Sequence, residues 1–434
     1  MTTKNLTILT ISLGFLLLGT NVCATLVKTK DMNPGIAENE RRKHPGRVYM
    51  RYLGTGGWLM RYRGYTMLMA PFYTNNGYGE LCLSETLGCL FPLDLFSIKS
   101  DRKRIRERLA DTPEILATRA VLAGHGHYDH LLDLPVILRY ILKKRPKSDT
   151  RPITVYGSRT SILTLRAAIC TQRSGGKSAG YPLVCPAKII FRKLNGVKTL
   201  VTCYKNEKNP KSCAPAGKWI PLGPDRQVRF MAIRSEHAPH IPPGIYALPK
   251  GARLKQIPDD LSGMRDWKEG RTFAFLLDFL TAPSPKKKAT EGRRPGKDQK
   301  IFFRVHYQDA ASSYSLGVPP QNITETRKTD LAVICAPQYN LVKNYPLPLL
   351  LRDLKPGFVM LGHWEDFFTP VSWERLEHRA APFLNPVHLR NTLRRGFRKA
   401  NMSVEVWVPR PGAAFIFPPA EKANVTLEVR GFSH

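Results

Sequence analysis

The sequence predicts an α/β fold with a substantial β-sheet, and three observations lead to this prediction. Runs rich in β-branched and aromatic residues begin at Val48 and recur along the chain, with glycine turns such as residues 54–57 between them. Residues 129–144 differ, because their leucines and isoleucines recur at helical spacing. A cluster of histidine and aspartate residues lies between a short apolar run at residues 119–123 and this helix. Open α/β sheets place ligands at such strand-to-helix turns.

The same patterns predict the individual elements. A helix with paired charges is expected over residues 102–109, and a second helix over residues 129–144. Strands are expected at residues 48–53, 58–62, 65–70, 119–123, 154–156, 227–233, 272–277, 301–305, 331–335 and 358–361. Residues 168–222 interrupt this rhythm with cysteine, glycine, lysine and proline, which indicates an insertion.

The N-terminus has the pattern of an export signal. Lys4 provides a positive start, residues 6–19 form an apolar stretch, and Val22-Cys23-Ala24 offers a small-x-small cleavage site. We therefore expect a signal peptide at residues 1–24 and a periplasmic or secreted protein. The apolar stretch is shorter than the roughly 20 residues that span a bilayer, so a retained membrane anchor is the weaker alternative.

The cysteines agree with an oxidising compartment. The chain has 8 cysteines, and Cys23 leaves with the signal. No Cys-x-x-Cys occurs, so local disulfides are favoured over a cysteine zinc site. The pairs expected from proximity are Cys82/Cys89, Cys170/Cys185 and Cys203/Cys213. Cys335 lies in an apolar run and is expected to be a buried free thiol.

The charge of the chain is strongly unbalanced. Among 434 residues, 67 lysines and arginines face 34 acidic residues, which gives a formal charge of +33. Such a charge attracts polyanions, among them nucleic acid, anionic lipid headgroups and cell-envelope polymers. No nucleic-acid-binding motif accompanies it. Peripheral contact with an anionic membrane surface is therefore one expectation, and the sequence leaves the oligomeric state open.

Residues 125–130, His-Gly-His-Tyr-Asp-His, carry the strongest chemical signal. Imidazole and carboxylate ligands together suit zinc, iron or manganese. His125 and His127 are two residues apart on extended backbone, so their side chains can point the same way. Asp129 and His130 begin the helix and can turn toward a second metal. Asp129 could instead cap the helix, but that interpretation leaves three histidines unexplained. The sequence therefore predicts a metal centre.

This motif resembles the His-x-His-x-Asp-His signature that follows a strand in the metallo-β-lactamase superfamily. The resemblance covers roughly residues 48–418 and implies an αββα sandwich, here with a cysteine-containing insertion. Residues 127–131 and Gly362-His363-Trp364 look most similar to the branch containing N-acyl-phosphatidylethanolamine phospholipase D and ascorbate-phosphate lactonase. The implied organisation is a signal peptide at 1–24, a flexible lead-in at 25–44, a hydrolase domain at 45–420 with the insertion at 168–222 and a basic loop at 281–300, and a tail at 421–434.

The resemblance also implies three ligands farther along the chain. A histidine after a later strand matches His237, with His240 as the reserve. A bridging aspartate at the end of another strand matches Asp309, although Gln308 stands where the family usually has glycine. The final histidine matches His363. The family's early Asp-Pro pair is here Ala70-Pro71, without the acid.

The implied site holds two metal ions, with zinc favoured and iron or manganese as alternatives. The first ion would be bound by His125, His127 and His237, the second by Asp129, His130 and His363, and Asp309 would bridge them. Of the neighbours, at least one of His306 and Tyr307 must face away because strand side chains alternate. Trp364 is expected in the core, whereas Glu365 and Asp366 would repel an anionic substrate if they lined the mouth of the site.

The implied function is hydrolysis by a metal-bound hydroxide, with Asp129 holding the hydroxide or moving its proton. The substrate would be a small or lipid-like molecule with a phosphodiester, other ester or lactone bond, and the charge favours an anionic one. One alternative is a redox enzyme of the same fold with iron. The other is a metal-stabilised envelope protein that binds polyanions, which the seven ligands disfavour because structural sites are usually closed by four.

Overall fold

The computed structural model describes residues 25–36, 44, 46–75, 98–172, 183–194, 200–202, 214–239, 261–263, 266–282, 299–313, 316–369, 373–375 and 377–419. The predicted signal peptide, most of the basic loop and the tail lie outside the described residues, and so do Cys82, Cys89, Cys203 and Cys213.

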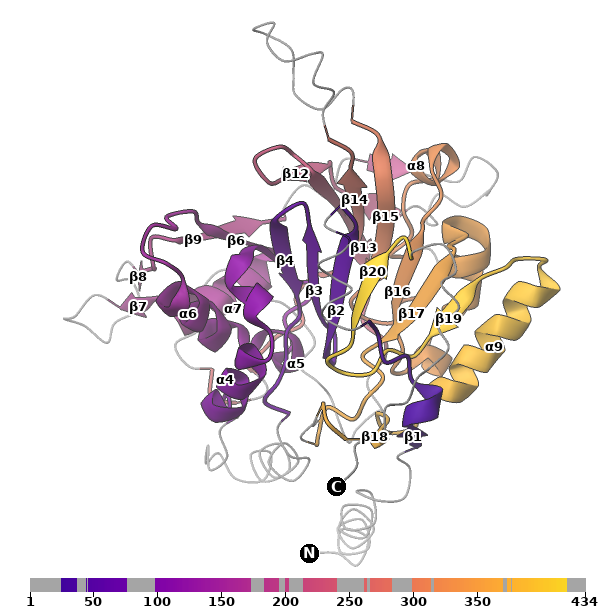
Figure 1. Cartoon of the computed structure of the whole chain (residues 1–434), viewed down its shortest axis with the longest axis horizontal. Helices are drawn as coiled ribbons and strands as arrows, with labels where there is room; N and C mark the ends of the chain where they lie inside the picture. The colour runs from indigo at the N-terminus through magenta and orange to yellow at the C-terminus, as the bar shows by residue number, and fades with distance from the viewer. Residues whose placement is uncertain are drawn as a thin grey trace, which may run out of the picture.

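Two mixed β-sheets pack against each other in the described chain (Figure 1). The first sheet has the strand order β20 (Ala414–Phe417), β2 (Val48–Gly54), β3 (Gly57–Tyr62), β4 (Tyr65–Met69), β5 (Thr118–Leu122), β6 (Ile153–Gly157), β9 (Ile189–Lys193). The second has the order β10 (Leu200–Thr202), β11 (Ala214–Ala216), β13 (Val228–Ser235), β14 (Thr272–Leu280), β15 (Ile301–Gln308), β16 (Leu331–Cys335), β17 (Phe358–Gly362), β19 (Glu405–Trp407), and β12 (Ile220–Leu222) pairs with β13. All ten predicted strands are therefore confirmed.

Each sheet changes from antiparallel to parallel pairing across its width. In the first sheet, β20, β2, β3 and β4 pair antiparallel, whereas β4, β5, β6 and β9 run parallel. In the second, β13, β14 and β15 pair antiparallel and β15, β16, β17 and β19 run parallel. Consequently β13, β15 and β17 all end at the same edge of the second sheet.

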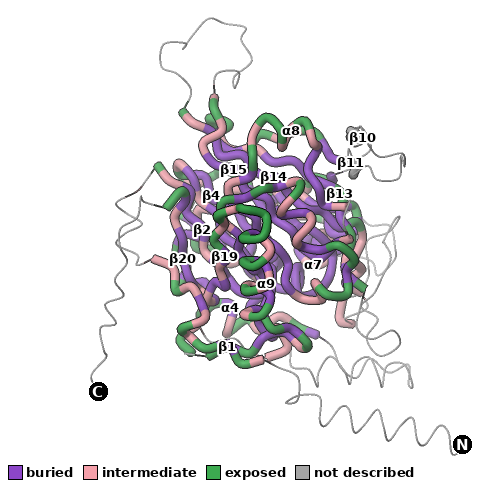
Figure 2. The backbone as a smooth tube through the Cα atoms, turned by 90° about the vertical axis from the view of Figure 1, so that its right-hand side faces the viewer, coloured by how far each residue is buried: buried purple, intermediate pink, exposed green. Residues whose placement is uncertain are grey.

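Strand alternation builds separate apolar cores on the two faces of each sheet. Along β3, Trp58 and Met60 belong to the core between the sheets, whereas Leu59 belongs to the core beneath the helices. Successive side chains of a strand point to opposite faces, so both faces of these strands are covered. Figure 2 shows the strands buried and the outer turns of α9 (Pro386–Lys399) exposed.

Helices cover both outer faces of the sandwich. Beside the first sheet lie α4 (Arg102–Ala110), η2 (Pro113–Ala117), α5 (Tyr128–Leu131), α6 (Leu134–Lys144) and α7 (Arg159–Ile169) (Figure 1). Beside the second lie α8 (Gln321–Thr326), η6 (Tyr339–Leu341), the π-helix η7 (Leu349–Leu354) and α9. The result is the predicted αββα sandwich.

The helix predicted over residues 129–144 is in fact two helices, α5 and α6, separated at Leu132 and Asp133. Pro135 lies in the first turn of α6, where its missing amide hydrogen costs nothing; within a continuous helix it would remove a hydrogen bond. The Asp133 carboxylate accepts hydrogen bonds from the amides of Tyr73 (2.6 Å) and Thr74 (2.7 Å). The break therefore attaches the helices to the segment that follows β4.

Two segments predicted to be irregular contribute strands. In the predicted lead-in, β1 (Leu26–Lys28) pairs with β18 (Glu377–Arg379), and η1 (Thr29–Asp31) follows it. Within residues 168–222, the short strands β7 (Thr171–Gln172) and β8 (Leu183–Val184) pair with each other, and β9 to β12 extend the two sheets. The described parts of this segment are thus attached to the sandwich, and its status as an insertion stays a prediction.

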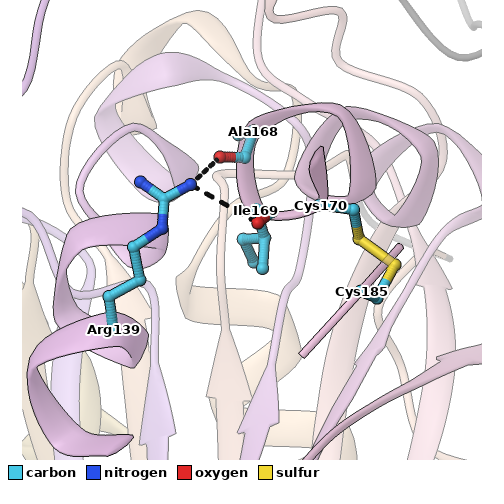
Figure 3. Close-up of a disulfide and its surroundings, with 5 residues drawn as sticks. All are labelled: Arg139, Ala168, Ile169, Cys170 and Cys185. Atoms are coloured by element: carbon cyan, nitrogen blue, oxygen red, sulfur yellow. Dashed lines mark hydrogen bonds between the residues drawn. A yellow bond between two sulfur atoms is a disulfide. The ribbon is translucent and has the colours of Figure 1, made fainter. Parts of the chain in front are cut away.

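A disulfide joins Cys170 to Cys185, which confirms one of the three expected pairs (Figure 3). Cys170 is the C-cap of α7, and the preceding carbonyls of Ala168 and Ile169 accept hydrogen bonds from Arg139 of α6 at 2.7 and 3.4 Å. The bond therefore fastens the segment after α7 to a helix end that α6 already holds. Cys335 is a buried free thiol, as predicted.

Among the described residues, no helix has the length and apolarity needed to cross a bilayer.

Candidate metal centre

Seven histidine and aspartate side chains meet at one edge of the sandwich. His125 and His127 lie on the loop between β5 and α5, and Asp129 and His130 lie on α5. His237, Asp309 and His363 follow the ends of β13, β15 and β17, respectively. The amide of Phe273 donates to Gly124 O at 2.8 Å, which holds the β5 loop against the second sheet. Ligand-binding loops at the carboxyl ends of strands are typical of α/β folds.

The first group consists of His125, His127 and His237, whose candidate ligand atoms lie within 4.8 Å of one another. The ring centroids of His127 lie 4.7 Å from those of both His125 and His237. His125 and His127 are fully buried, whereas His237 is partly exposed. The Nδ1 atom of His237 lies 2.9 Å from Ala238 O, and this contact fixes the orientation of the imidazole if Nδ1 carries the proton. His240 lies outside the described residues.

The second group is centred on Asp129. Its Oδ2 atom lies 3.2 Å from His363 Nε2 and 3.4 Å from His130 Nε2. Asp309 contacts imidazoles of both groups, because Oδ2 lies 2.5 Å from His125 Nδ1 and Oδ1 lies 3.3 Å from His130 Nδ1. The Asp309 carboxylate therefore lies between the two groups. The structure thus brings all seven predicted residues together, and their roles as ligands stay a prediction.

Three buried atoms of the cluster, without hydrogen-bond partners in the described part of the chain, bear on whether these residues suit a metal. His125 Nε2, Asp129 Oδ1 and His363 Nδ1 are buried and have no hydrogen-bond partner among the described residues. Buried polar atoms of proteins are rarely left unpaired, since each costs about 1–3 kcal/mol. Imidazole nitrogen and carboxylate oxygen are zinc ligands, and coordination would satisfy these atoms. The side chains therefore fit a divalent transition metal.

The ionisable groups of the cluster shift one another's pKa. Burial alone would raise the pKa of Asp309, but the charges of His130 and His125 hold it well below its ordinary value. Burial lowers the pKa of His130, yet the charges of Asp309 and Asp129 raise it to about 9 overall. Burial lowers the pKa of His363. At neutral pH the Asp309 carboxylate is therefore ionised and His363 is neutral, the protonation states that metal ligands need, whereas His130 must release a proton to bind a metal.

The backbone at His363 is unusual. Its φ angle is +59°, in the left-handed region that residues other than glycine seldom adopt. The His363 amide donates to the Tyr52 hydroxyl at 2.9 Å, which holds the residue in this conformation. Such backbone conformations concentrate at functional sites, where surrounding contacts maintain them.

Tyr307 and His306, next to each other on β15, point to opposite sides of the sheet, as strand alternation requires. The Tyr307 hydroxyl lies 2.6 Å from Asp309 Oδ1, whereas His306 points away and its Nε2 contacts Gly317 O at 2.8 Å. Trp364 is completely buried and donates to Pro409 O, which confirms its place in the core. Glu365 is also completely buried and does not line the mouth of the site, so it cannot repel a substrate there.

Sequence reasoning missed the supporting role of the glycine turn between β2 and β3 and of Tyr307. Strand alternation placed one of His306 and Tyr307 on the metal face but could not choose between them. The glycines at residues 54–57 predict only a turn between two strands, whereas a Cβ atom on Gly56 would lie 2.8 Å from His130 Cε1. A glycine-rich turn beside a predicted metal motif could have suggested such close contact.

The architecture and the order of the candidate ligands agree with what the resemblance implies. Two mixed sheets pack between helices, and the seven side chains follow the strands in the expected order. The chain thus has the αββα sandwich that the resemblance to the metallo-β-lactamase superfamily implies.

Solved structures with similar folds are distant in sequence. A metallo hydrolase from the hyperthermophilic archaeon Ignicoccus hospitalis is similar over 86% of this chain and 99% of its own, at 12% identity and a TM-score of 0.40. The metallo-β-lactamase fold protein YhfI from Bacillus subtilis is similar over 85% of this chain and 99% of its own, at 13% identity and a TM-score of 0.39. An isothiocyanate hydrolase from Delia radicum gut bacteria covers 84% and 98%, at 11% identity and 0.39. The sequence matches no protein-family model and no curated protein.

The close approach of Asp309 to the β5 loop gives a test of the site. A Cβ atom on Gly124 would lie 2.2 Å from both Cγ and Oδ2 of Asp309, so Gly124→Ala must displace the carboxylate. We expect the variant to bind less metal and to hydrolyse its substrate about 100-fold more slowly, because misplacing a reacting group by about 1 Å has an effect of this size. Gly46→Ala is the matched control, because a Cβ there meets nothing within 4 Å. Equal metal content in both variants would contradict the assignment of Asp309 to the site.

Proposed function

We propose that this chain is a metal-dependent hydrolase. The observation that supports it most directly is the meeting of seven histidine and aspartate side chains from four separate strand ends. Six of them, all except His237, are buried, and His125, Asp129 and His363 each have a buried side-chain atom without a hydrogen-bond partner among the described residues. Such an arrangement is costly for a purely structural purpose, since every unsatisfied buried polar group destabilises the fold.

The residues of the chain have distinct roles in this proposal. Bound metal ions would supply a hydroxide nucleophile near neutral pH and would polarise the phosphoryl or carbonyl oxygen of the substrate. Asp309 holds the two histidine groups at a fixed separation through its two carboxylate oxygens. Asp129 is oriented by His363 and His130 through Oδ2, which leaves Oδ1 to accept and pass on a proton.

The finer parts of the proposal are the metal, the substrate and the location. We favour zinc because histidine and carboxylate ligands suit it, with iron or manganese as alternatives. The formal charge of +33 favours an anionic substrate, so a phosphodiester is proposed ahead of lactones and other esters. The signal-like N-terminus and the Cys170–Cys185 disulfide support an exported protein.

Metal analysis of the purified chain tests the proposal. We expect about two transition-metal ions per chain in protein prepared without chelator, because each histidine group can hold one ion. Removal of the ions with a chelator should abolish hydrolysis, and added Zn²⁺ should restore it. Activity should be sought against a panel of phosphodiesters, lactones and β-lactams.

Three results separate the alternatives. A chain that binds no metal would contradict the proposal outright. Iron as the resident metal, with oxygen consumption and no hydrolysis, would favour the redox enzyme. Bound metal with no turnover on the panel, together with tight binding of polyanions, would favour the envelope protein.

A further inference from the structure

The turn between β2 and β3, residues 54–57, lies against the proposed second metal position. Gly56 packs so closely on the imidazole of His130 that a Cβ atom would lie 2.8 Å from Cε1 and 3.1 Å from Nδ1. The same glycine presents its carbonyl oxygen to the Tyr307 hydroxyl at 2.8 Å. The turn belongs to the first sheet and Tyr307 to the second, so this contact joins the sheets beside the site.

Tyr307 passes this connection on to Asp309. Its hydroxyl lies 2.6 Å from Asp309 Oδ1, and the ring is 1% exposed. A phenol is a donor at neutral pH, and its hydrogen bond to a carboxylate is charge-assisted and therefore strong. The Gly56 carbonyl is a second acceptor for the same hydroxyl hydrogen, so the Tyr307 hydroxyl lies between the turn and Asp309 Oδ1. This contact restricts the movement of Asp309 Oδ1 relative to the turn.

A second set of contacts joins the same turn to His363. The Tyr52 hydroxyl lies 2.5 Å from Glu365 Oε2 and 2.9 Å from Thr55 O. It also accepts a hydrogen bond from the His363 amide at 2.9 Å. Glu365 in turn accepts a hydrogen bond from the Thr55 amide through Oε1. The turn and the loop that carries His363 are therefore held together by buried hydrogen bonds.

We propose that Tyr307 is a positioning residue that fixes Asp309 against the β2–β3 turn, and that this turn supports the second metal position more than the first. The inference rests on the proposed function. Three residues touched by this arrangement, His130, Asp309 and His363, are the bridging carboxylate and two of the three ligands assigned to the second ion. Hydrogen bonds that orient ligands typically contribute 10–100-fold to metal affinity.

The test compares Tyr307→Phe with Tyr62→Phe. The Tyr62 hydroxyl donates to Leu280 O at 3.0 Å in the same core, so both variants lose a buried hydroxyl but only Tyr307 contacts a candidate ligand. The full chain, stripped of metal, is titrated with Co²⁺ while its visible absorption is recorded. We expect Tyr307→Phe to bind the second equivalent 10–100-fold more weakly, with an altered spectrum, and to bind the first equivalent normally. Tyr62→Phe should bind both equivalents as the parent chain does.

Gly56→Ala is the second variant if Tyr307→Phe fails to fold, with Gly46→Ala as its control. The added methyl group should displace His130 and weaken the second equivalent in the same way. The inference is overturned if Tyr307→Phe or Gly56→Ala binds both equivalents like its control, or if both equivalents weaken equally. If the parent chain binds two ions and a variant gives either of these results, only the role of the turn is contradicted. A parent chain that binds none contradicts the proposed function as well.

Discussion

Asp309→Ala is expected to reduce hydrolysis to the uncatalysed rate and bound metal from two ions to at most one. Two cations of a dinuclear site lie about 3.5–4 Å apart, where their repulsion is strong without an anion between them. Asp309 faces His125, His130 and Tyr307 and takes no part in the apolar cores, so the fold should survive. Metal content, circular dichroism and turnover of an identified substrate measure the three effects.

Asp129→Ala should have the same effect on turnover for a different reason. Asp129 is held by His363 and His130, and its loss removes both a ligand of the second ion and the proton acceptor at Oδ1. The histidines of the first group remain, so one ion should stay bound. Asp111→Ala makes the same chemical change at a side chain that is 54% exposed and should be silent. His240→Ala should also keep two ions if His237 is the ligand. Normal turnover by folded Asp309→Ala or Asp129→Ala would refute the dinuclear mechanism.

Asp278→Ala is expected to lower the free energy of unfolding by about 3–5 kcal/mol, the usual effect of removing one partner of a buried ion pair. Asp278 of β14 is completely buried, and it pairs in register with Arg229 of β13 and Arg304 of β15. Its carboxylate lies 2.7 Å from both guanidinium groups. Arg304 is 1% exposed and also donates to the carbonyls of Ile323 and Arg327. Without Asp278 this guanidinium would remain buried without a counter-ion.

Urea unfolding followed by fluorescence measures this loss, with Asp111→Ala again as the control. Asp111 pairs with Arg108 at the surface at 3.5 Å, and such pairs contribute at most about 1 kcal/mol. The metal content of Asp278→Ala should be unchanged while the protein is folded, because the ion pair lies away from the seven candidate ligands. A loss no larger than that of Asp111→Ala would show that Arg304 finds other partners.

The sequence alone was enough to predict the α/β class, ten strands and the residues of the candidate metal centre. Strand alternation and helical spacing are local properties, so short apolar runs such as residues 331–335 reveal their structure without any knowledge of their neighbours. The histidine and aspartate residues at 125–130 have side chains that bind metals. Their spacing also predicts which of them point the same way, because side chains two residues apart on extended backbone lie on one side. The later candidates, His237, Asp309 and His363, required in addition the resemblance to a known order of strands and ligands.

Only the tertiary structure decided which of these residues meet and what holds them there. Pro135 is a local signal for the start of α6, but the hydrogen bonds from Tyr73 and Thr74 that hold Asp133 at the break come from about 60 residues away in the chain. The space that Asp309 occupies exists because residue 124 is a glycine, and the contact of Tyr307 with Gly56 spans 251 residues. Contacts between distant segments depend on how the two sheets pack, and no local pattern encodes this packing. The sequence by itself therefore determined the chemistry of the site, whereas the packing of one sheet on the other decided its geometry.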